Sequence, residues 1–119
     1  MITLVAEDRC VGCNVCVEVC PTNVLEAAAS GPPRIARQAD CQTCFMCELY
    51  CRADAIYVDP DCEATAPVDE AALKASGLMG QYRRDSGWDE WAPDPARANA
   101  HWRMDAIFAR ARAAATESK

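Results

Sequence analysis

Two cysteine runs with the same spacing constrain this chain more than any other feature. The run CVGCNVCVEVCP, residues 10–21, holds four cysteines, and CQTCFMCELYCR, residues 41–52, repeats their spacing 31 residues later. The eight cysteines align without a gap, so the first half of the chain is an internal duplication. A half-chain of about sixty residues usually needs cross-links to be stable, and these cysteines are predicted to provide them.

The surrounding residues predict the same coarse structure in each copy. A strand comes before each run, near 2–5 and 34–36, and a second strand follows, near 24–26 and 55–58. The three closely spaced cysteines are expected on an irregular loop, and a helix of one or two turns leads to the fourth. Ser30-Gly31-Pro32-Pro33 predicts a turn between the copies. The expected fold class is α+β, with two hairpin-like strand pairs and two short helices related by pseudo-two-fold symmetry.

The spacing C-x2-C-x2-C-x3-C indicates what the cysteines bind. Three thiolates from one loop can converge on one centre, whereas Cys20 lies one helical turn beyond Cys16, about 5–6 Å away between Cβ atoms. The fourth sulfur is therefore displaced from the first three and is available to the site of the other copy. This is the pattern of two-cluster iron–sulfur proteins.

Three other interpretations of the cysteines explain less. Zinc sites prefer pairs of C-x2-C knuckles to three cysteines at successive intervals. A disulfide framework conflicts with the odd total of nine cysteines and with a reducing compartment. A thioredoxin-like C-x-x-C motif would account for only two cysteines of each four.

Residues 1–62 resemble the bacterial dicluster ferredoxins, which carry two [4Fe–4S] clusters in a ferredoxin-like fold. The first run fits the family motif at every cysteine and at Pro21, and the second fits at every cysteine. The resemblance implies one cluster held by Cys10, Cys13, Cys16 and Cys51. It implies a second held by Cys41, Cys44, Cys47 and Cys20. The apolar residues expected to keep water off the clusters are Val5, Val11, Val19, Val24, Leu25, Leu49, Ile56 and Val58.

Two residues of the first half depart from this pattern. Arg52 stands where the family usually has proline, and a cation beside Cys51 would favour the more negative, reduced state of the first cluster. The hypothesis is that Arg52 raises the potential of that cluster; the alternative is a solvated surface arginine. Cys62 has no counterpart in the other copy, and it is either a bystander thiol or a redox-sensitive one.

Charge and composition exclude several classes of function. The net charge is −6, which argues against binding to nucleic acid. The N-terminus has no basic leader with an apolar stretch, and no segment is apolar enough to span a membrane, so a cytoplasmic protein without membrane contact is expected. The sequence has no phosphate-binding loop, no nucleophile elbow and a single histidine, His101. The chain is therefore not expected to be catalytic alone.

Residues 63–119 are interpreted as a C-terminal arm. A short helix is predicted at about 67–76, ending at Gly77, and a terminal amphipathic helix at about 95–114, beginning at Asp94-Pro95. The segment between them is expected to be a glycine-rich connector. Residues 1–62 carry four arginines against nine acidic residues, whereas residues 95–119 carry five basic residues against two acidic ones. The apolar stripe of the terminal helix comprises Met104, Ile107, Phe108 and Ala111.

The stripe on the terminal helix must be covered by another surface. It could fold back on the first half, or the arm could embrace another protein. The second alternative is favoured by Trp88, Trp91 and Trp102, since tryptophan is enriched in interface hot spots.

This organisation is similar to the ferredoxin-like small subunits of FAD-dependent oxidoreductases, which implies a flavoprotein partner with the FAD in that partner. The predicted function is an electron-transfer iron–sulfur subunit. The alternatives are a free, diffusible ferredoxin that serves several redox enzymes and a regulatory module with structural or oxygen-sensing clusters.

Overall fold

The computed structural model describes residues 1–64, 67–96 and 105–117, and it forms a small α+β fold. Strand β1 (Ile2–Val5), helix α1 (Val15–Val19) and strand β2 (Leu25–Glu26) come from the first copy of the duplication. Strand β3 (Arg34–Ile35), a 3-10 turn (Gln38–Asp40), helix α2 (Met46–Tyr50) and strand β4 (Ile56–Val58) come from the second. The predicted class, with two strand pairs and two short helices, is consistent with a ferredoxin-like fold.

The two strand pairs each join one strand of the first copy to one strand of the second. Strands β2 and β3 form an antiparallel hairpin, with Leu25 opposite Ile35. Strand β1 pairs antiparallel with β4, with Val5 opposite Ile56, so this pair joins the two ends of the duplication and is not a hairpin. The prediction of two hairpin-like pairs is therefore wrong for β1 and β4. The N-terminal amine donates to the carbonyl oxygen of Asp59 at 2.6 Å, which holds β1 against the end of β4.

Helices α1 and α2 begin one residue before the third cysteine of each run, so Cys16 and Cys47 lie in helices and not on the expected loop. Each helix follows a residue in the left-handed region, Asn14 with φ 59° and Phe45 with φ 63°. That conformation turns the chain, and each helix starts two residues after the second cysteine of its run. Both helices end at the fourth cysteine, as predicted.

Residues 31 apart also repeat the same left-handed backbone conformation at two further places. Gly12 corresponds to Thr43, and Asn23 corresponds to Asp54, all with φ between 51° and 74°. The duplication is thus visible in the local backbone of the loops as well as in the cysteine spacing. The overall two-fold relation between the copies stays a prediction.

The hydrophobic core lies between the two strand pairs and the two helices. It consists of residues that are at most 2% exposed, and cysteine side chains pack against it. Its members are Ile2, Val24, Leu25, Ile56 and Val58. Seven of the eight apolar residues expected to shield the cysteines are buried or half-buried, but Val11 is 77% exposed, so the prediction is wrong for Val11.

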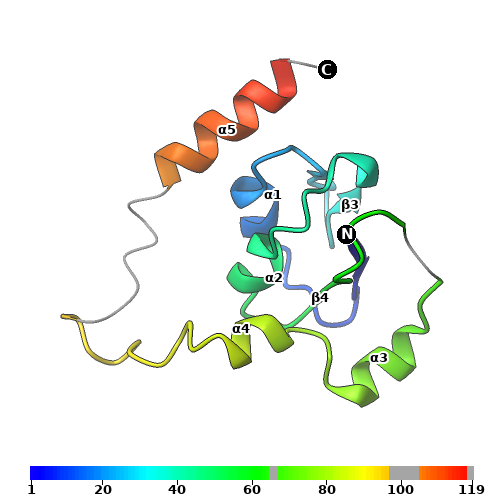
Figure 1. Cartoon of the computed structure of the whole chain (residues 1–119), viewed down its shortest axis with the longest axis vertical. Helices are drawn as coiled ribbons and strands as arrows, with labels where there is room; N and C mark the ends of the chain where they lie inside the picture. The colour runs from blue at the N-terminus through cyan, green and yellow to red at the C-terminus, as the bar shows by residue number, and fades with distance from the viewer. Residues whose placement is uncertain (65–66, 97–104, 118–119) are drawn as a thin grey trace.

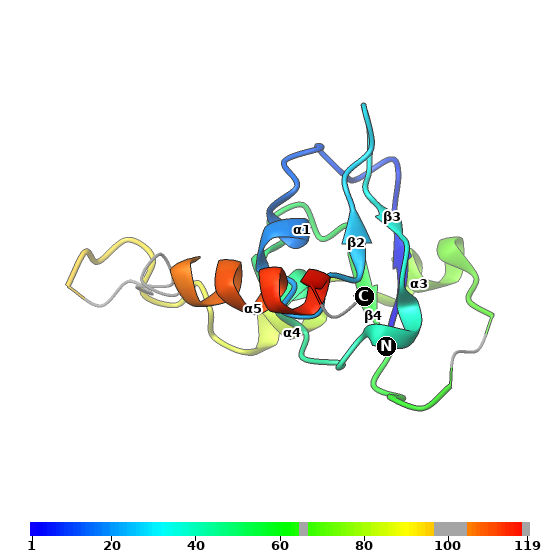
Figure 2. The same ribbon diagram turned by 90° about the horizontal axis from the view of Figure 1, so that it is seen from above.

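The second half of the chain folds back on the first. Helix α3 (Glu70–Ser76) begins after the N-cap Asp69 and ends at Gly77, the predicted stop. Helix α4 (Gln81–Asp85) lies in the segment predicted to be a connector, and it packs against α2. Helix α5 (Asp105–Glu117) lies along α1, so α4 and α5 cover different sides of the first half (Figures 1 and 2).

The terminal helix differs from its expected bounds. Pro95 and Ala96 lie in a turn, so the helix does not begin at Pro95, and α5 continues to Glu117, beyond the expected end at 114. Trp102, Met104 and His101 lie outside the described residues. Within α5, Phe108 contacts the ring of Tyr50 edge-on at 6.0 Å, and Arg112 donates to the carbonyl oxygen of Val17 at 3.3 Å.

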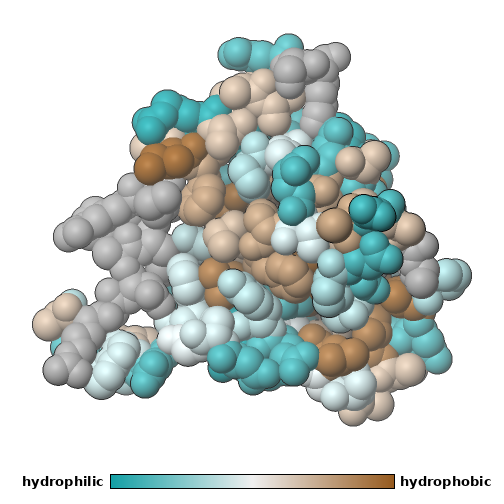
Figure 3. Space-filling view, in the orientation of Figure 1, coloured by the Kyte–Doolittle hydropathy of each residue, from teal (hydrophilic) through white to brown (hydrophobic). Residues whose placement is uncertain are grey.

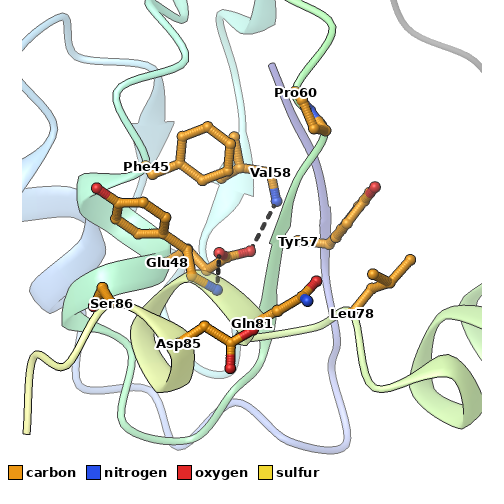
Figure 4. Close-up of a pocket in the computed structure, with 10 residues that line it drawn as sticks. Phe45, Glu48, Tyr57, Val58, Pro60, Leu78, Gln81, Asp85 and Ser86 are labelled. Carbon is orange, nitrogen blue, oxygen red and sulfur yellow. Dashed lines mark hydrogen bonds between the residues drawn. The ribbon is translucent and has the colours of Figure 1, made fainter.

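A buried glutamate links α4 to the first half of the chain. Glu48 of α2 is 2% exposed, and its two carboxylate oxygens accept the backbone N–H groups of Val58 and Tyr82, each at 3.2 Å (Figure 4). One N–H belongs to β4 and the other to α4, so a single side chain fixes both elements. Burial raises the pKa of Glu48, and the two N–H groups partly offset this effect.

Arg83 of α4 is the second buried charge at this contact. It is 7% exposed, donates to the carbonyl oxygen of Leu49, and forms a two-point ion pair with Asp89 at 2.8 and 3.0 Å. The guanidinium is thus paired on both sides, as a buried charge requires. On the face shown in Figure 3, apolar residues lie in small groups between hydrophilic ones.

Candidate metal centre

The first cavity of interest lies where α1 approaches the end of α2. Four cysteines line it, three from the first run and one from the second: Cys10, Cys13, Cys16 and Cys51. Its other walls are mainly apolar and include Val5, Ala55 and Ile56. The fold thus brings together the four cysteines that the family resemblance groups as one set.

A second cavity lies next to the hydrophobic core. Its four cysteines are Cys41, Cys44 and Cys47 from the second run and Cys20 from the first. The surrounding walls include four residues of the hydrophobic core, namely Ile2, Val24, Leu25 and Val58, and the ring of Phe45. Cys20 and Cys51, which directly follow α1 and α2, therefore each line the cavity formed mainly by the other run.

Backbone N–H groups at equivalent places in the two copies donate to cysteine sulfurs. The N–H two residues after the first cysteine of each run donates to that cysteine at 3.4 Å, and the N–H four residues after the fourth cysteine does the same. Such bonds orient the side chains and stabilise negative charge on sulfur. The donors are Gly12, Thr43, Val24 and Ala55, and the acceptors are Cys10, Cys41, Cys20 and Cys51.

Burial makes several of these thiols hard to ionise on their own. Burial, followed by the charges of Cys51 and Cys13, raises the pKa of Cys16 to about 12. Burial is also the main cause that raises the pKa of Cys44 and, further, that of Cys47. Metals bind thiolates, so loading these sites is expected to release protons and to supply the positive charge that the clustered sulfurs lack.

The residues present fit an iron–sulfur cluster better than a single ion. All nine cysteines have free thiols. Among the residues described, no three His, Cys, Asp or Glu side chains converge closely enough to hold one metal ion. Cysteines that bind a cluster attach to different iron atoms, so their sulfurs surround the cluster and do not converge on one ion.

Two buried polar atoms beside the cysteines have no hydrogen-bond partner within the described ranges, Asn14 Oδ1 and Thr43 Oγ1. Asn14 lines the first cavity, and Thr43 lies between Cys41 and Cys44. The Thr43 hydroxyl can donate to a sulfur atom, which would satisfy it in a loaded site.

The other candidate residues lie outside the two cavities. Cys62 is exposed beyond β4. Arg52 is exposed next to Cys51, and Trp88 packs on Tyr50 with ring centroids 5.3 Å apart. Trp91 is 45% exposed. Sequence reasoning missed Glu48, because a glutamate in a short helix gives no local sign that it will be buried.

Comparisons with known proteins point to the same chemistry. Residues 4–26, which contain the whole first run, match the family described as the 4Fe-4S binding domain. The chain is 28% identical over 81 residues to the "Ferredoxin-like protein in nif region" of a Nostoc species and to the protein of that name in Trichormus variabilis. The match covers 64% of this chain and 62% of each relative. No solved structure matches.

These findings support [4Fe–4S] cluster binding by the segment that holds the first cysteine run, and they show that the chain is similar to ferredoxin-like proteins. None of the helices in the part of the chain that the structure describes is long and apolar enough to cross a membrane.

Proposed function

We propose that the chain holds two [4Fe–4S] clusters and carries single electrons through them. The observation that carries this proposal is the pair of cavities, each lined by three cysteines of one run and one cysteine of the other. Cys10, Cys13, Cys16 and Cys51 would hold the first cluster. Cys41, Cys44, Cys47 and Cys20 would hold the second. A bound [4Fe–4S] cluster accepts and releases one electron at a time, at a potential that depends on burial and hydrogen bonds to sulfur.

Paired cysteine substitutions test the exchange of the fourth ligand. The wild-type chain, purified without oxygen, is expected to contain about eight iron atoms. Removing Cys10 and Cys51 together should cost one cluster, because both belong to one proposed set. Removing Cys10 and Cys20 together should cost both clusters, although these two cysteines lie in the same run. Cys62→Ala is the control and should retain all the iron; the reverse ranking of the two double variants would contradict the crossed sets.

We further propose that the chain is the electron-transfer subunit of a flavoprotein oxidoreductase, with FAD in the partner. Support comes from the arm: α5 carries Ile107, which is 45% exposed, and Trp91 is exposed to the same extent. The basic terminal segment and the acidic first half could contact different surfaces. The proposed partner surface comprises Trp88, Trp91, Trp102 and the 95–114 segment, and an external donor or acceptor would dock elsewhere.

The alternative is a free ferredoxin, and one observation favours it. The arm already contacts the first half of its own chain, with Trp88 packed on Tyr50 and Phe108 packed on the same ring. A tail used in this way contributes to its own fold and needs no partner to cover it.

An anaerobic affinity purification from the native cell separates the two proposals. A subunit should bring down a flavoprotein in near-equal amount, and the flavoprotein should be lost when residues 97–119 are deleted. That deletion removes α5 but spares the buried contacts of Glu48 and Arg83, which join α4 to the first half. A brown protein that elutes alone from both samples would contradict the subunit proposal and support the free carrier.

A further inference from the structure

A surface hollow of about 350 Å³ lies beside the first cysteine set, between the two halves of the chain. Cys13 and Cys51 form part of its wall, so its contents would lie directly against the proposed first cluster. Helix α4 and the turn after it close the other side with Arg83 and Trp88. The first half thus supplies most of the wall of the hollow, and the tail completes it.

The hollow has an aromatic wall. Tyr50 and Trp88 both line it, with ring centroids 5.3 Å apart and planes inclined by 56°. Val11 adds an apolar surface that is 77% exposed, although it lies among the cysteines. Aromatic and apolar walls of this kind favour a flat conjugated ring, and the volume is at the lower end of small-molecule sites, which start at about 300 Å³.

The hollow also carries an uncommitted positive charge. Arg52 lines it and is exposed, and in the part of the chain that the structure describes its guanidinium forms no hydrogen bond or ion pair. Arg83, the other arginine of the wall, is occupied by Asp89 and by the carbonyl oxygen of Leu49. Arg52 is thus the cation that can receive a ligand, and an arginine fork suits a phosphate or carboxylate.

From these three features we propose that the hollow binds a planar aromatic anion, a free small molecule whose ring lies against the wall formed by Trp88 and Tyr50 and whose acidic group pairs with Arg52. Flavin mononucleotide represents this class, since it joins a conjugated ring to a phosphate. The site lies beside Cys13 and Cys51, where a redox-active ring would be close to the proposed cluster. The proposal goes beyond the proposed electron-transfer function, because it assigns a ligand to this chain itself.

Equilibrium dialysis of the anaerobic, iron-loaded full chain tests the proposal, with flavin mononucleotide and riboflavin as matched probes. Flavin mononucleotide should bind saturably, and riboflavin, which lacks the phosphate, about tenfold more weakly, as expected for one charge-assisted contact. Arg52→Gln should reduce binding of flavin mononucleotide by about the same factor and leave riboflavin unchanged. Trp88→Leu should weaken both probes.

Arg34→Gln is the matched control, because Arg34 is an exposed arginine paired with Glu26, and Arg34 does not line the hollow. It removes the same charge and should leave both affinities unchanged. Equal weakening by Arg34→Gln and Arg52→Gln, or no saturable binding at millimolar flavin mononucleotide, would overturn the proposal. The iron content of each sample is measured in parallel, so a missing cluster, which would count against the proposed function, is distinguished from a missing ligand site.

Discussion

At the scale of single residues, Glu48 holds together two parts of the chain that are far apart in sequence. Its oxygens accept one N–H from β4 and one from α4, and its side chain is almost wholly buried. Tyr82 lies in the first turn of α4, where a backbone N–H group has no acceptor within the helix. A buried carboxylate that accepts two backbone N–H groups can stabilise a contact despite the cost of removing its charge from water.

Glu48→Gln is expected to loosen this contact. Glutamine has one carbonyl oxygen, so one of the N–H groups of Val58 and Tyr82 would face an NH₂ group and lose its acceptor. The expected loss is about 1–3 kcal/mol, which lowers the temperature at which the visible absorbance disappears by roughly 4–12 °C. The matched control is Glu18→Gln, because Glu18 lies exposed in α1. Equal melting of wild type and Glu48→Gln would contradict the assigned contact.

The stabilities of wild type and Glu48→Gln should depend differently on pH. The pKa of Glu48 in the folded protein is raised above its ordinary value of 4.5, chiefly by burial. A carboxyl group with a raised folded pKa binds its proton more tightly in the folded state, so stability is lost as pH rises from 4.5 through the folded pKa. The advantage of wild type over Glu48→Gln should therefore shrink as pH rises over this window. A widening difference would show that the folded pKa is lowered instead.

At the scale of elements, sequence predicted well where local chemistry decides and poorly where distant contacts decide. Helices α1 and α2 end at the fourth cysteine of each run, and α3 stops at Gly77, because spacing and glycine act locally. The pairing of β1 with β4 depends on residues more than fifty positions apart. Nor does any local pattern predict α4, since a five-residue helix has little stability of its own. Contacts with Glu48 and Leu49 provide the stability that the sequence of α4 does not provide alone.

Two glycines of this region provide a matched test of how α4 is seated. Gly77 and Gly80 both have a left-handed backbone, with φ 78° and 75°. A Cβ at Gly77 meets nothing within 4 Å, whereas a Cβ at Gly80 would lie 2.1 Å from Asp54 Oδ1 and 2.8 Å from its Cβ. Gly77→Ala should therefore cost only the left-handed backbone penalty of about 1–2 kcal/mol, and Gly80→Ala should also displace α4.

Limited trypsin digestion measures this displacement, because α4 contains Arg83 and Arg84. Arg83 is buried and Arg84 pairs with Asp54 at 2.9 Å, so both peptide bonds should be cut slowly in wild type. Cleavage should be much faster in Gly80→Ala than in Gly77→Ala. Similar rates in the two variants would mean that Asp54 moves aside and that α4 does not depend on this close approach.

At the scale of the whole molecule, the tail consists of two parts with different relations to the first half. The part around α4 supplies buried groups, among them Met79 at 1% exposure and Arg83 at 7%. Helix α5 is mostly exposed; Phe108 contacts Tyr50 of α2, and Arg112 donates to Val17 of α1. The predicted domain boundary at residue 62 follows the end of the cysteine pattern. It therefore separates Cys13 and Cys51 from Arg83 and Trp88, which line the same hollow.

Two truncations should reveal this division. A chain that ends at residue 96 keeps the contacts of Glu48 and Arg83 and the packing of Trp88 on Tyr50, so it should retain its iron and melt close to the full-length protein. A chain that ends at residue 62 leaves Glu48 without the N–H of Tyr82 and exposes Leu49, and it should lose iron at a clearly lower temperature. Visible absorbance during anaerobic heating measures both. If the chain ending at 62 is as stable as the other, α4 is dispensable to the first half, and the whole tail is then available to a partner.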